Sequence, residues 1–309
     1  MENFQRKELV TGRRIKYTYY STPEESPACL PALLFLHGFP DSAHLWAGVI
    51  RHLGNLPNKI IVPDCLGYGG TDKPTDTNRY AYRHQAEDIA DILSNENANN
   101  TIIIGHDWGS ALAQRTYLHK SHLFSGMVLL NIGYMVPSSE PFDLAAFNSY
   151  TEETIGYPQF SYWDFFVAFD AVDIVENNLE RMWQVLHGDV EDWMRKIFCA
   201  PDAMRDFLLG TEQVPLKEYA KQPEWKDQFM QQSDATIPKE DLKINVPLLF
   251  ICCTDDAVCT RELMDDAKQQ GLVPHLTEVT IKSAHWSPME KPDSIARHIK
   301  IFLGNMTLH

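Results

Sequence analysis

Short apolar segments alternate along the chain with longer amphipathic ones, and this alternation predicts the secondary structure. Residues 13–22 alternate between apolar and polar side chains, as in an antiparallel strand. Other segments are apolar throughout, which is typical of strands in a parallel sheet that helices cover on both faces. These segments are 31–38, 59–64, 101–107 and 125–133, followed less cleanly by 246–254 and 276–284.

Helical spacing of apolar residues marks segments between the strands, for example 83–96 and 110–120. Alternation of strands and helices predicts an α/β protein with a mostly parallel sheet flanked by helices. The pattern is interrupted over 134–241, a region that is rich in aromatic residues and helix formers and has no strand-like run. We therefore predict a core made of 1–133 and 242–309, with an inserted helical region between the two parts.

The composition argues against several classes of partner. The 309 residues carry a formal net charge of −15 at pH 7, which disfavours nucleic acid and anionic membranes because both would repel the protein. No apolar run approaches the roughly 20 residues that a membrane-spanning helix needs. The polar start of the chain lacks the apolar segment of a secretory signal. We therefore expect a cytoplasmic protein without a membrane span.

The six cysteines fit the same location. They are scattered through predicted core segments, as free buried thiols in a reducing compartment would be. Cys252, Cys253 and Cys259 lie close together in the sequence, but their spacing matches no zinc-binding pattern. We therefore expect no metal site.

The first stretch with recognisable chemistry reads GHDWG and follows the apolar strand at 101–107. Gly105 and Gly109 flank Asp107 at two residues each way. Small neighbours are needed where a strained strand-to-helix turn exposes a nucleophile, because the adjoining helix packs close to it. Hydrolases built on this turn usually carry Ser at its tip. Here the sequence places a carboxylate where a hydroxyl is usual.

The sequence also supplies partners for this carboxylate. The backbone N–H groups of Trp108 and of Phe39, in the loop HGFP, would face a developing anion at the turn. Downstream, the order nucleophile, acid, histidine is the one expected of α/β-hydrolases. His285 is the candidate base. Asp255 and Asp256 are both candidates for the acid that orients it, and we prefer Asp256 because an apolar stretch follows it.

The motifs HGFPDS, PDCLGYGGTDKP, GHDWGS, TDDAVC and AHWSPMEKP together resemble those of α/β-hydrolases of the soluble epoxide hydrolase family, over nearly the whole core. The resemblance implies an α/β-hydrolase fold in which the insertion is a lid. It implies hydrolysis of an epoxide, an apolar or amphipathic small molecule, to a vicinal diol through an ester on Asp107, without metal or cofactor. In the lid, GYPQFSYWDFF resembles the segment that carries a catalytic tyrosine, and the matching residue is Tyr157. The sequence leaves a homodimer open.

The chain departs from the family at the second lid tyrosine, which usually belongs to a Trp–Tyr pair near the end of the lid. No such pair occurs between Gly210 and residue 246. Three alternatives stay open: Tyr157 acts alone, another residue such as Tyr219 or Tyr162 takes the second role, or the activity is altered. The residues that we expect to contact the substrate are Trp163, Tyr219 and Trp286.

Two other functions stay open. A haloalkane or haloacid dehalogenase uses the same Asp and His, and Trp108 could donate to a halide. However, haloalkane dehalogenases generally have Asn after the Gly of the HGFP loop, and a halide needs no proton from Tyr157. A catalytically weak homologue that binds a ligand is the second alternative, although a pure binder has no need of Asp107, Asp256 and His285 together. A serine esterase is disfavoured because no Ser stands at the turn. The sequence does not determine the substrate, the stereochemistry or the biological role.

Overall fold

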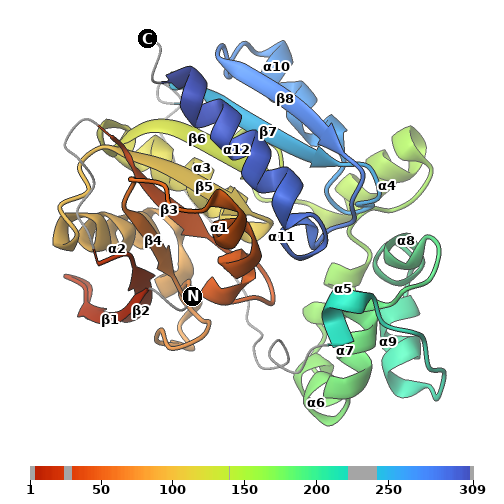
Figure 1. The fold of residues 1–309 in the computed structure, drawn as a ribbon. Helices are drawn as coiled ribbons and strands as arrows, with labels where there is room; N and C mark the ends of the chain where they lie inside the picture. The colour runs from red at the N-terminus through yellow and green to blue at the C-terminus, as the bar shows by residue number, and fades with distance from the viewer. Residues whose placement is uncertain (1–3, 24–29, 139, 222–241, 307–309) are drawn as a thin grey trace. The chain divides into compact units, whose positions relative to one another are not determined.

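The computed structural model describes residues 4–23, 30–138, 140–221 and 242–306 (Figure 1). These residues form two compact units. The first comprises the described residues of Met1–Ser139, Gln228–Thr254 and Cys259–His309, and the second those of Glu140–Asp227 and Asp255–Val258. The insertion predicted from the sequence spans 134–241, of which 222–241 lies outside the described residues.

The first unit is built on an eight-stranded sheet with the order β1-β2-β4-β3-β5-β6-β7-β8. The pairs β1–β2 and β2–β4 are antiparallel, and the remaining pairs are parallel. This confirms the expected α/β class with a mostly parallel sheet. The strands are β1 (Gln5–Val10), β2 (Lys16–Ser21), β3 (Ala32–Leu36), β4 (Ile60–Pro63), β5 (Thr101–His106), β6 (Phe124–Leu130), β7 (Leu248–Cys253) and β8 (Leu276–Ile281).

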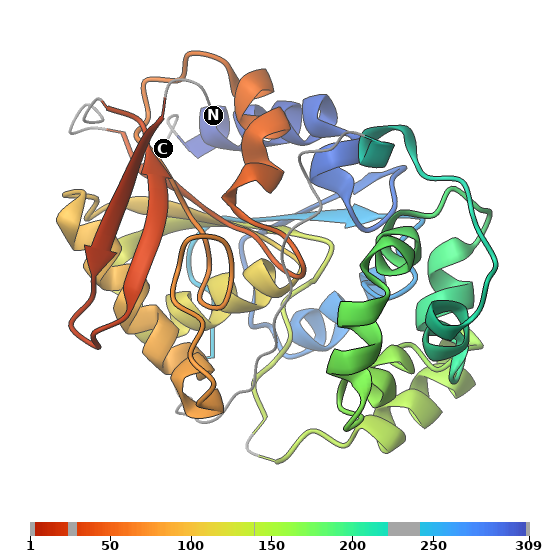
Figure 2. The same ribbon diagram turned by 90° about the horizontal axis from the view of Figure 1, so that it is seen from below.

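Helices cover both faces of this sheet, which is why its central strands are apolar throughout. Every residue of β3, β4, β5 and β7 is buried. Figures 1 and 2 show α1 and α12 together on one face, with α2 and α3 on the other. The helices of this unit are α1 (Ala47–Leu53), α2 (Tyr82–Asn95), α3 (Trp108–Lys120), α10 (Asp265–Gln269), α11 (Ser287–Glu290) and α12 (Pro292–Met306). Among the described residues, no helix combines the length and the apolar character that crossing a membrane requires.

Strand β1 has no counterpart among the strands predicted from the sequence. Its sequence, QRKELV, is mostly polar, and its residues alternate between exposed and half-buried positions. The strand lies at the edge of the sheet and pairs only with β2. Charged side chains are common on edge strands because they discourage pairing with another chain, so the apolar signal of a strand is weak there.

The second unit is helical in the described residues, apart from one isolated bridge between Gly188 and Leu216. Arg181 is a central element of its core: the buried guanidinium donates to the carbonyl groups of Phe207, Leu208 and Glu212, and it stacks over the Phe207 ring at 4.3 Å. These bonds add donors to two carbonyl groups in the last turn of α9, where helical N–H donors run out, and to that of Glu212 just after the helix. The helices are α4 (Leu144–Ile155), α5 (Tyr162–Phe166), α6 (Ala171–Asn177), α7 (Leu179–His187), α8 (Trp193–Phe198) and α9 (Ala203–Leu209).

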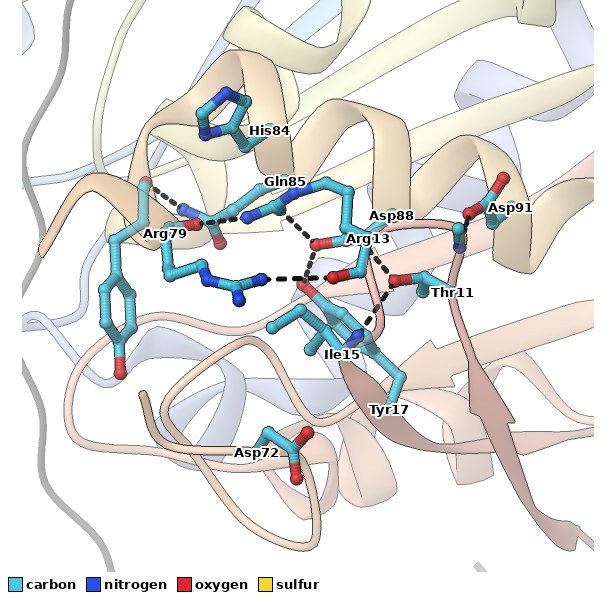
Figure 3. Close-up of polar contacts among 12 residues, drawn as sticks. Thr11, Arg13, Ile15, Tyr17, Asp72, Arg79, His84, Gln85, Asp88 and Asp91 are labelled. Carbon is cyan, nitrogen blue, oxygen red and sulfur yellow. Dashed lines mark hydrogen bonds and ion pairs between the residues drawn. The ribbon is translucent and has the colours of Figure 1, made fainter. Parts of the chain in front are cut away.

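A buried carboxylate on α2 ties the N-terminal hairpin to the helical layer (Figure 3). Asp88 is fully buried and accepts hydrogen bonds from Thr11 Oγ1 at 2.7 Å, Arg13 Nη1 at 2.6 Å and Tyr17 Oη at 3.3 Å. Burial raises the pKa of Asp88 above its ordinary value, and Thr11 and Arg13 oppose the rise. The folded protein therefore depends on these donors to keep a buried charge.

Replacing Arg13 with Met tests this dependence. Removing one partner of a buried ion pair is expected to lower the free energy of unfolding by roughly 3–5 kcal/mol. Because the pKa of Asp88 is raised, stability falls as pH rises through the interval between its ordinary and folded pKa values, and loss of Arg13 extends this interval upward. The loss measured by urea unfolding should therefore be larger at about pH 8 than at about pH 4.

The matched control is Arg297→Met, which removes an exposed ion pair with Asp293 on α12. Exposed pairs contribute about 0–1 kcal/mol, so this variant should unfold close to the parent at both pH values. Equal losses for the two variants would contradict the role given to Asp88.

Candidate active site

Asp107 stands at the tip of a strained turn between β5 and α3. Its backbone has φ 52° and ψ −128°, a conformation that side-chain-bearing residues rarely adopt and that costs energy unless the surroundings impose it. The turn is held by bonds from Asp107 N to Leu130 O at 3.3 Å and from Ser110 N to Asp107 O at 2.8 Å. Ser110 Oγ also donates to Leu130 O at 3.0 Å. The turn is thus fastened to the end of β6.

The glycines of this turn have no room for a side chain. A Cβ atom on Gly105 would lie 2.3 Å from Gly109 O, and a Cβ atom on Gly109 would lie 2.2 Å from Leu36 O. Both obstacles are backbone atoms, so they cannot move aside as a flexible side chain would. The glycines of the Gly–x–Asp–x–Gly sequence are therefore required because the backbones of strand, turn and helix approach so closely.

Two backbone N–H groups contact the Asp107 carboxylate. Phe39 N donates to Asp107 Oδ1 at 2.9 Å, and the N–H of Trp108 also bonds to this carboxylate. Gly38 makes the approach possible, because a Cβ atom there would lie 2.2 Å from Asp107 Oδ1. The structure therefore brings the N–H groups of Phe39 and Trp108 against the Asp107 carboxylate.

His37 fixes the loop that carries Phe39. Its Nε2 accepts from Cys65 N at 2.9 Å, so the proton is on Nδ1, which donates to Gly38 O at 2.9 Å. Burial lowers the pKa of His37, so the ring stays neutral. The loop therefore has a fixed shape around the carboxylate.

His285 meets Asp107 from the chain segment after β8. Its Nε2 lies 3.2 Å from Asp107 Oδ2, and both side chains are buried. The segment is anchored by His106 Nε2, which donates to His285 O at 2.7 Å, and by Ser287 Oγ, which donates to Asn131 Oδ1 at 2.9 Å. Residues from three strand ends thus hold the imidazole against the carboxylate.

This environment keeps Asp107 ionised. Burial by itself would raise the pKa of Asp107, but the hydrogen bond and charge of His285, the charge of His106 and the Trp108 N–H outweigh burial and lower the pKa below its ordinary value. The turn therefore presents a carboxylate anion, paired with an imidazole and held by backbone N–H groups. This arrangement can attack an electrophilic carbon and stabilise an anion at the same carboxyl group.

Two groups of this cluster, Asp41 and Cys259, are not among the site residues predicted from the sequence. Burial, followed by the negative charge of Asp107, raises the pKa of Asp41 to about 8, opposed by His285 and the indole of Trp286. Cys259 is buried, and its Sγ lies within 4.8 Å of donor atoms of Asp107 and His285. Asp41 follows the HGFP loop directly, so its position was a usable signal. Nothing in the sequence separates Cys259 from a plain core thiol.

Two further candidates, Tyr157 and Asp256, lie in the second unit, in segments joined to each other by hydrogen bonds. Tyr157 Oη donates to Ala257 O at 3.2 Å, and Gln159 Nε2 donates to Val258 O at 3.0 Å. Asp256 is buried in the same segment, and its Oδ1 accepts from Val258 N at 3.1 Å. The segment that carries the predicted acid is therefore bonded to the segment that carries the predicted phenol.

The three residues expected to contact the substrate, Tyr219, Trp163 and Trp286, have different neighbours. Tyr219 Oη lies 3.2 Å from Nδ1 of His187, the last residue of α7. Trp163 stacks on Phe160 with ring centroids 4.7 Å apart. Trp286 is in the first unit, where its ring meets that of His285 edge-on at 5.0 Å. Of the three residues expected to contact the substrate, Trp286 is the one beside the Asp107–His285 pair in the described first unit.

Comparison with known proteins identifies relatives of this chain. A family model described as alpha/beta hydrolase fold matches residues 31–292. The chain is 24% identical over 298 residues to epoxide hydrolase A of Mycobacterium tuberculosis, with 90% of this chain and 92% of the relative covered. It is 26% identical over 324 residues to a haloalkane dehalogenase of Sphingobium indicum, with 96% and 94% covered. A crystal structure of an epoxide hydrolase from Vigna radiata has a similar fold, with a TM-score of 0.72, 19% identity and 99% of each chain covered.

Replacing Gly105 with Ala tests the packing of the turn. The added methyl group meets backbone at 2.3 Å, so the strand or the helix must shift. We expect the free energy of unfolding in urea to fall by about 1–3 kcal/mol, the usual cost of overpacking. Gly304→Ala is the control: the added Cβ meets no atom within 4 Å in helix α12. The free energy of unfolding of the control should be unchanged, or higher by up to about 1 kcal/mol. A Gly105→Ala variant as stable as the control would contradict the statement that Gly105 has no room for a side chain.

Proposed function

Since the chain belongs to the alpha/beta hydrolase fold family, we propose that it hydrolyses an epoxide to a vicinal diol through a covalent ester on Asp107. The observation that carries the proposal is the ionised carboxylate at the tip of the turn, 3.2 Å from His285 Nε2. A serine at this position would form an ether with an epoxide carbon, which water does not cleave. A carboxylate forms an ester, which water does cleave.

In the first step, an Asp107 oxygen attacks one carbon of the oxirane. The new carbon–oxygen bond forms as the ring carbon–oxygen bond breaks, and the electron pair goes to the departing oxygen. An alkoxide is a poor leaving group unless it receives a proton. We assign this proton to the phenol of Tyr157, which in the resting structure donates to Ala257 O.

In the second step, His285 removes a proton from water, and the hydroxide attacks the carboxyl carbon of the Asp107 ester. The N–H groups of Phe39 and Trp108 already contact this carboxyl group, so they are suited to stabilise the oxyanion. Collapse of the intermediate expels the substrate alkoxide, which keeps the oxygen that Asp107 contributed and takes the proton held by His285 to give the diol. The proton left on the re-formed Asp107 carboxyl group returns to the Tyr157 phenolate, which restores the resting enzyme. Asp107 keeps one oxygen from water. Asp256 is assigned the role of orienting His285.

The substrate class rests on the relatives and on the absence of a Ser at the turn. Epoxide hydrolase A and the Vigna radiata enzyme are named for epoxides, and the haloalkane dehalogenase for haloalkanes. We prefer the epoxide because Tyr157 offers a proton that halide departure does not need. A cytoplasmic location stays a prediction, supported by the described cysteines, all five of which are buried and free of disulfides. A homodimer also stays a prediction.

Replacing His285 with Gln should stop the second step and leave the first. The alkyl ester should then accumulate, visible by intact-protein mass spectrometry as a gain equal to the mass of one epoxide. The matched control is His122→Gln, an exposed histidine in the 3₁₀ turn Ser121–Leu123. The control should turn over without accumulating the ester. Normal turnover by the His285 variant would disprove the assigned mechanism.

A separate experiment on the parent enzyme distinguishes the two substrate classes. Paired epoxide and haloalkane substrates of similar size are supplied to the parent enzyme, and diol and halide are measured. Diol without halide supports the proposal. Halide release without diol would replace it with the dehalogenase alternative.

Replacing Tyr157 with Phe should slow formation of the ester and leave its hydrolysis unchanged. Loss of a general acid typically costs roughly 10²- to 10⁴-fold in rate. Ester formation is followed by quenched-flow mass spectrometry in the His285→Gln background, where the ester is trapped. Tyr150→Phe is the control, because Tyr150 is exposed in α4. Ester formation at the parental rate in the Tyr157 variant would remove this tyrosine from the mechanism.

A further inference from the structure

Three different metal-binding atoms meet at the turn, all within the first unit. An oxygen of Asp107, the Sγ atom of Cys259 and a ring nitrogen of His285 all lie within 4.8 Å of one another. The three side chains are buried, with relative exposures of 7%, 3% and 4%. The proposed mechanism uses the carboxylate and the imidazole but has no use for the thiol.

The distances suit a small cation with tetrahedral coordination. Zinc binds nitrogen, oxygen and sulfur at about 2.0–2.3 Å, so neighbouring ligand atoms in a tetrahedral site lie roughly 3.3–3.8 Å apart. His285 Nε2 and Asp107 Oδ2 are 3.2 Å apart, close to this spacing. Cys259 would need to approach by up to about 1.5 Å. It lies in the irregular segment after β7, where no helix or strand holds it in place.

The charges and the donor types also suit such an ion. A carboxylate and a thiolate carry two negative charges, and a neutral imidazole carries none, so a divalent cation would make the buried cluster electrically neutral. Neutrality matters because an unbalanced charge is costly to bury. The mixture of sulfur and nitrogen with one oxygen favours zinc and similarly soft ions, whereas magnesium and calcium require mostly oxygen ligands.

We propose that Asp107, Cys259 and His285 form a binding site for Zn²⁺ or a cation of similar softness, and that the bound ion blocks hydrolysis. Coordination occupies the oxygen lone pair that would attack carbon and the nitrogen lone pair that would accept a proton. The ion is therefore an inhibitor and not a cofactor. The inhibition rests on the proposed function, whereas the binding does not.

Binding is tested on the metal-free full chain by calorimetric titration with Zn²⁺ and by the absorption spectrum with Co²⁺. One equivalent should bind, and the cobalt form should show a thiolate-to-cobalt charge-transfer band. Cys259→Ser should lose the band and bind Zn²⁺ at least about tenfold more weakly, since changes outside the ligand shell already cost 10- to 100-fold. Cys253→Ala, which alters a buried thiol of β7, should behave as the parent.

A second variant keeps the test decisive if Cys259→Ser fails to fold. Asp107→Asn keeps the shape of the side chain, removes its charge and should also weaken Zn²⁺ binding while retaining the charge-transfer band. Zn²⁺ binding of parental strength in both variants, or a cobalt form without the band in the parent, would overturn the site.

Inhibition is tested by adding Zn²⁺ to the parent during epoxide hydrolysis and then adding a chelator. Activity should fall with Zn²⁺, recover with the chelator and be unaffected by Mg²⁺. Full activity with the site saturated would overturn the inhibitory half of the proposal. If no epoxide is hydrolysed under any condition, the proposed function fails, while the cobalt spectrum still decides whether the site exists.

Discussion

The contacts of the Asp107 carboxylate with His285 and with the N–H groups of Phe39 and Trp108 determine how the candidate active site is built. The carboxylate is buried, and a buried anion without partners would take up a proton. The hydrogen bond and charge of His285, the charge of His106 and the Trp108 N–H group instead hold its pKa below the ordinary value, and the Phe39 N–H group also donates to the carboxylate. The strained backbone of Asp107 is the structural cost of this arrangement, and the glycines around it are required because the backbones approach so closely.

The sheet of the first unit positions these three partners around the carboxylate. The three come from segments far apart in the sequence, and the parallel sheet brings them to the same edge because its strands end there. His37 fixes the loop of Phe39, and His106 fixes the segment of His285. Buried histidines of this kind are structural donors and acceptors here, so their presence near the nucleophile does not make them bases.

The same geometry has a second consequence. An anionic oxygen and an imidazole nitrogen 3.2 Å apart form a good nucleophile–base pair and also half of a tetrahedral metal site. An apolar side chain in place of Cys259 would leave the proposed zinc site without its third ligand. The Cys259 thiol supplies that ligand, and the other two are the proposed catalytic pair. Zinc binding and hydrolysis therefore exclude each other.

The sequence by itself determined the fold class, the central strands and the turn around Asp107, because these depend on local patterns: apolar runs, glycine spacing and the order of motifs. It also identified His285, Phe39 and Trp108, which the structure brings to Asp107. It did not reveal β1, whose edge position removes the apolar signal. Only the tertiary structure decided that Asp41 and Cys259 join the cluster. Which distant side chains meet depends on how strands and loops pack, and no local pattern encodes that.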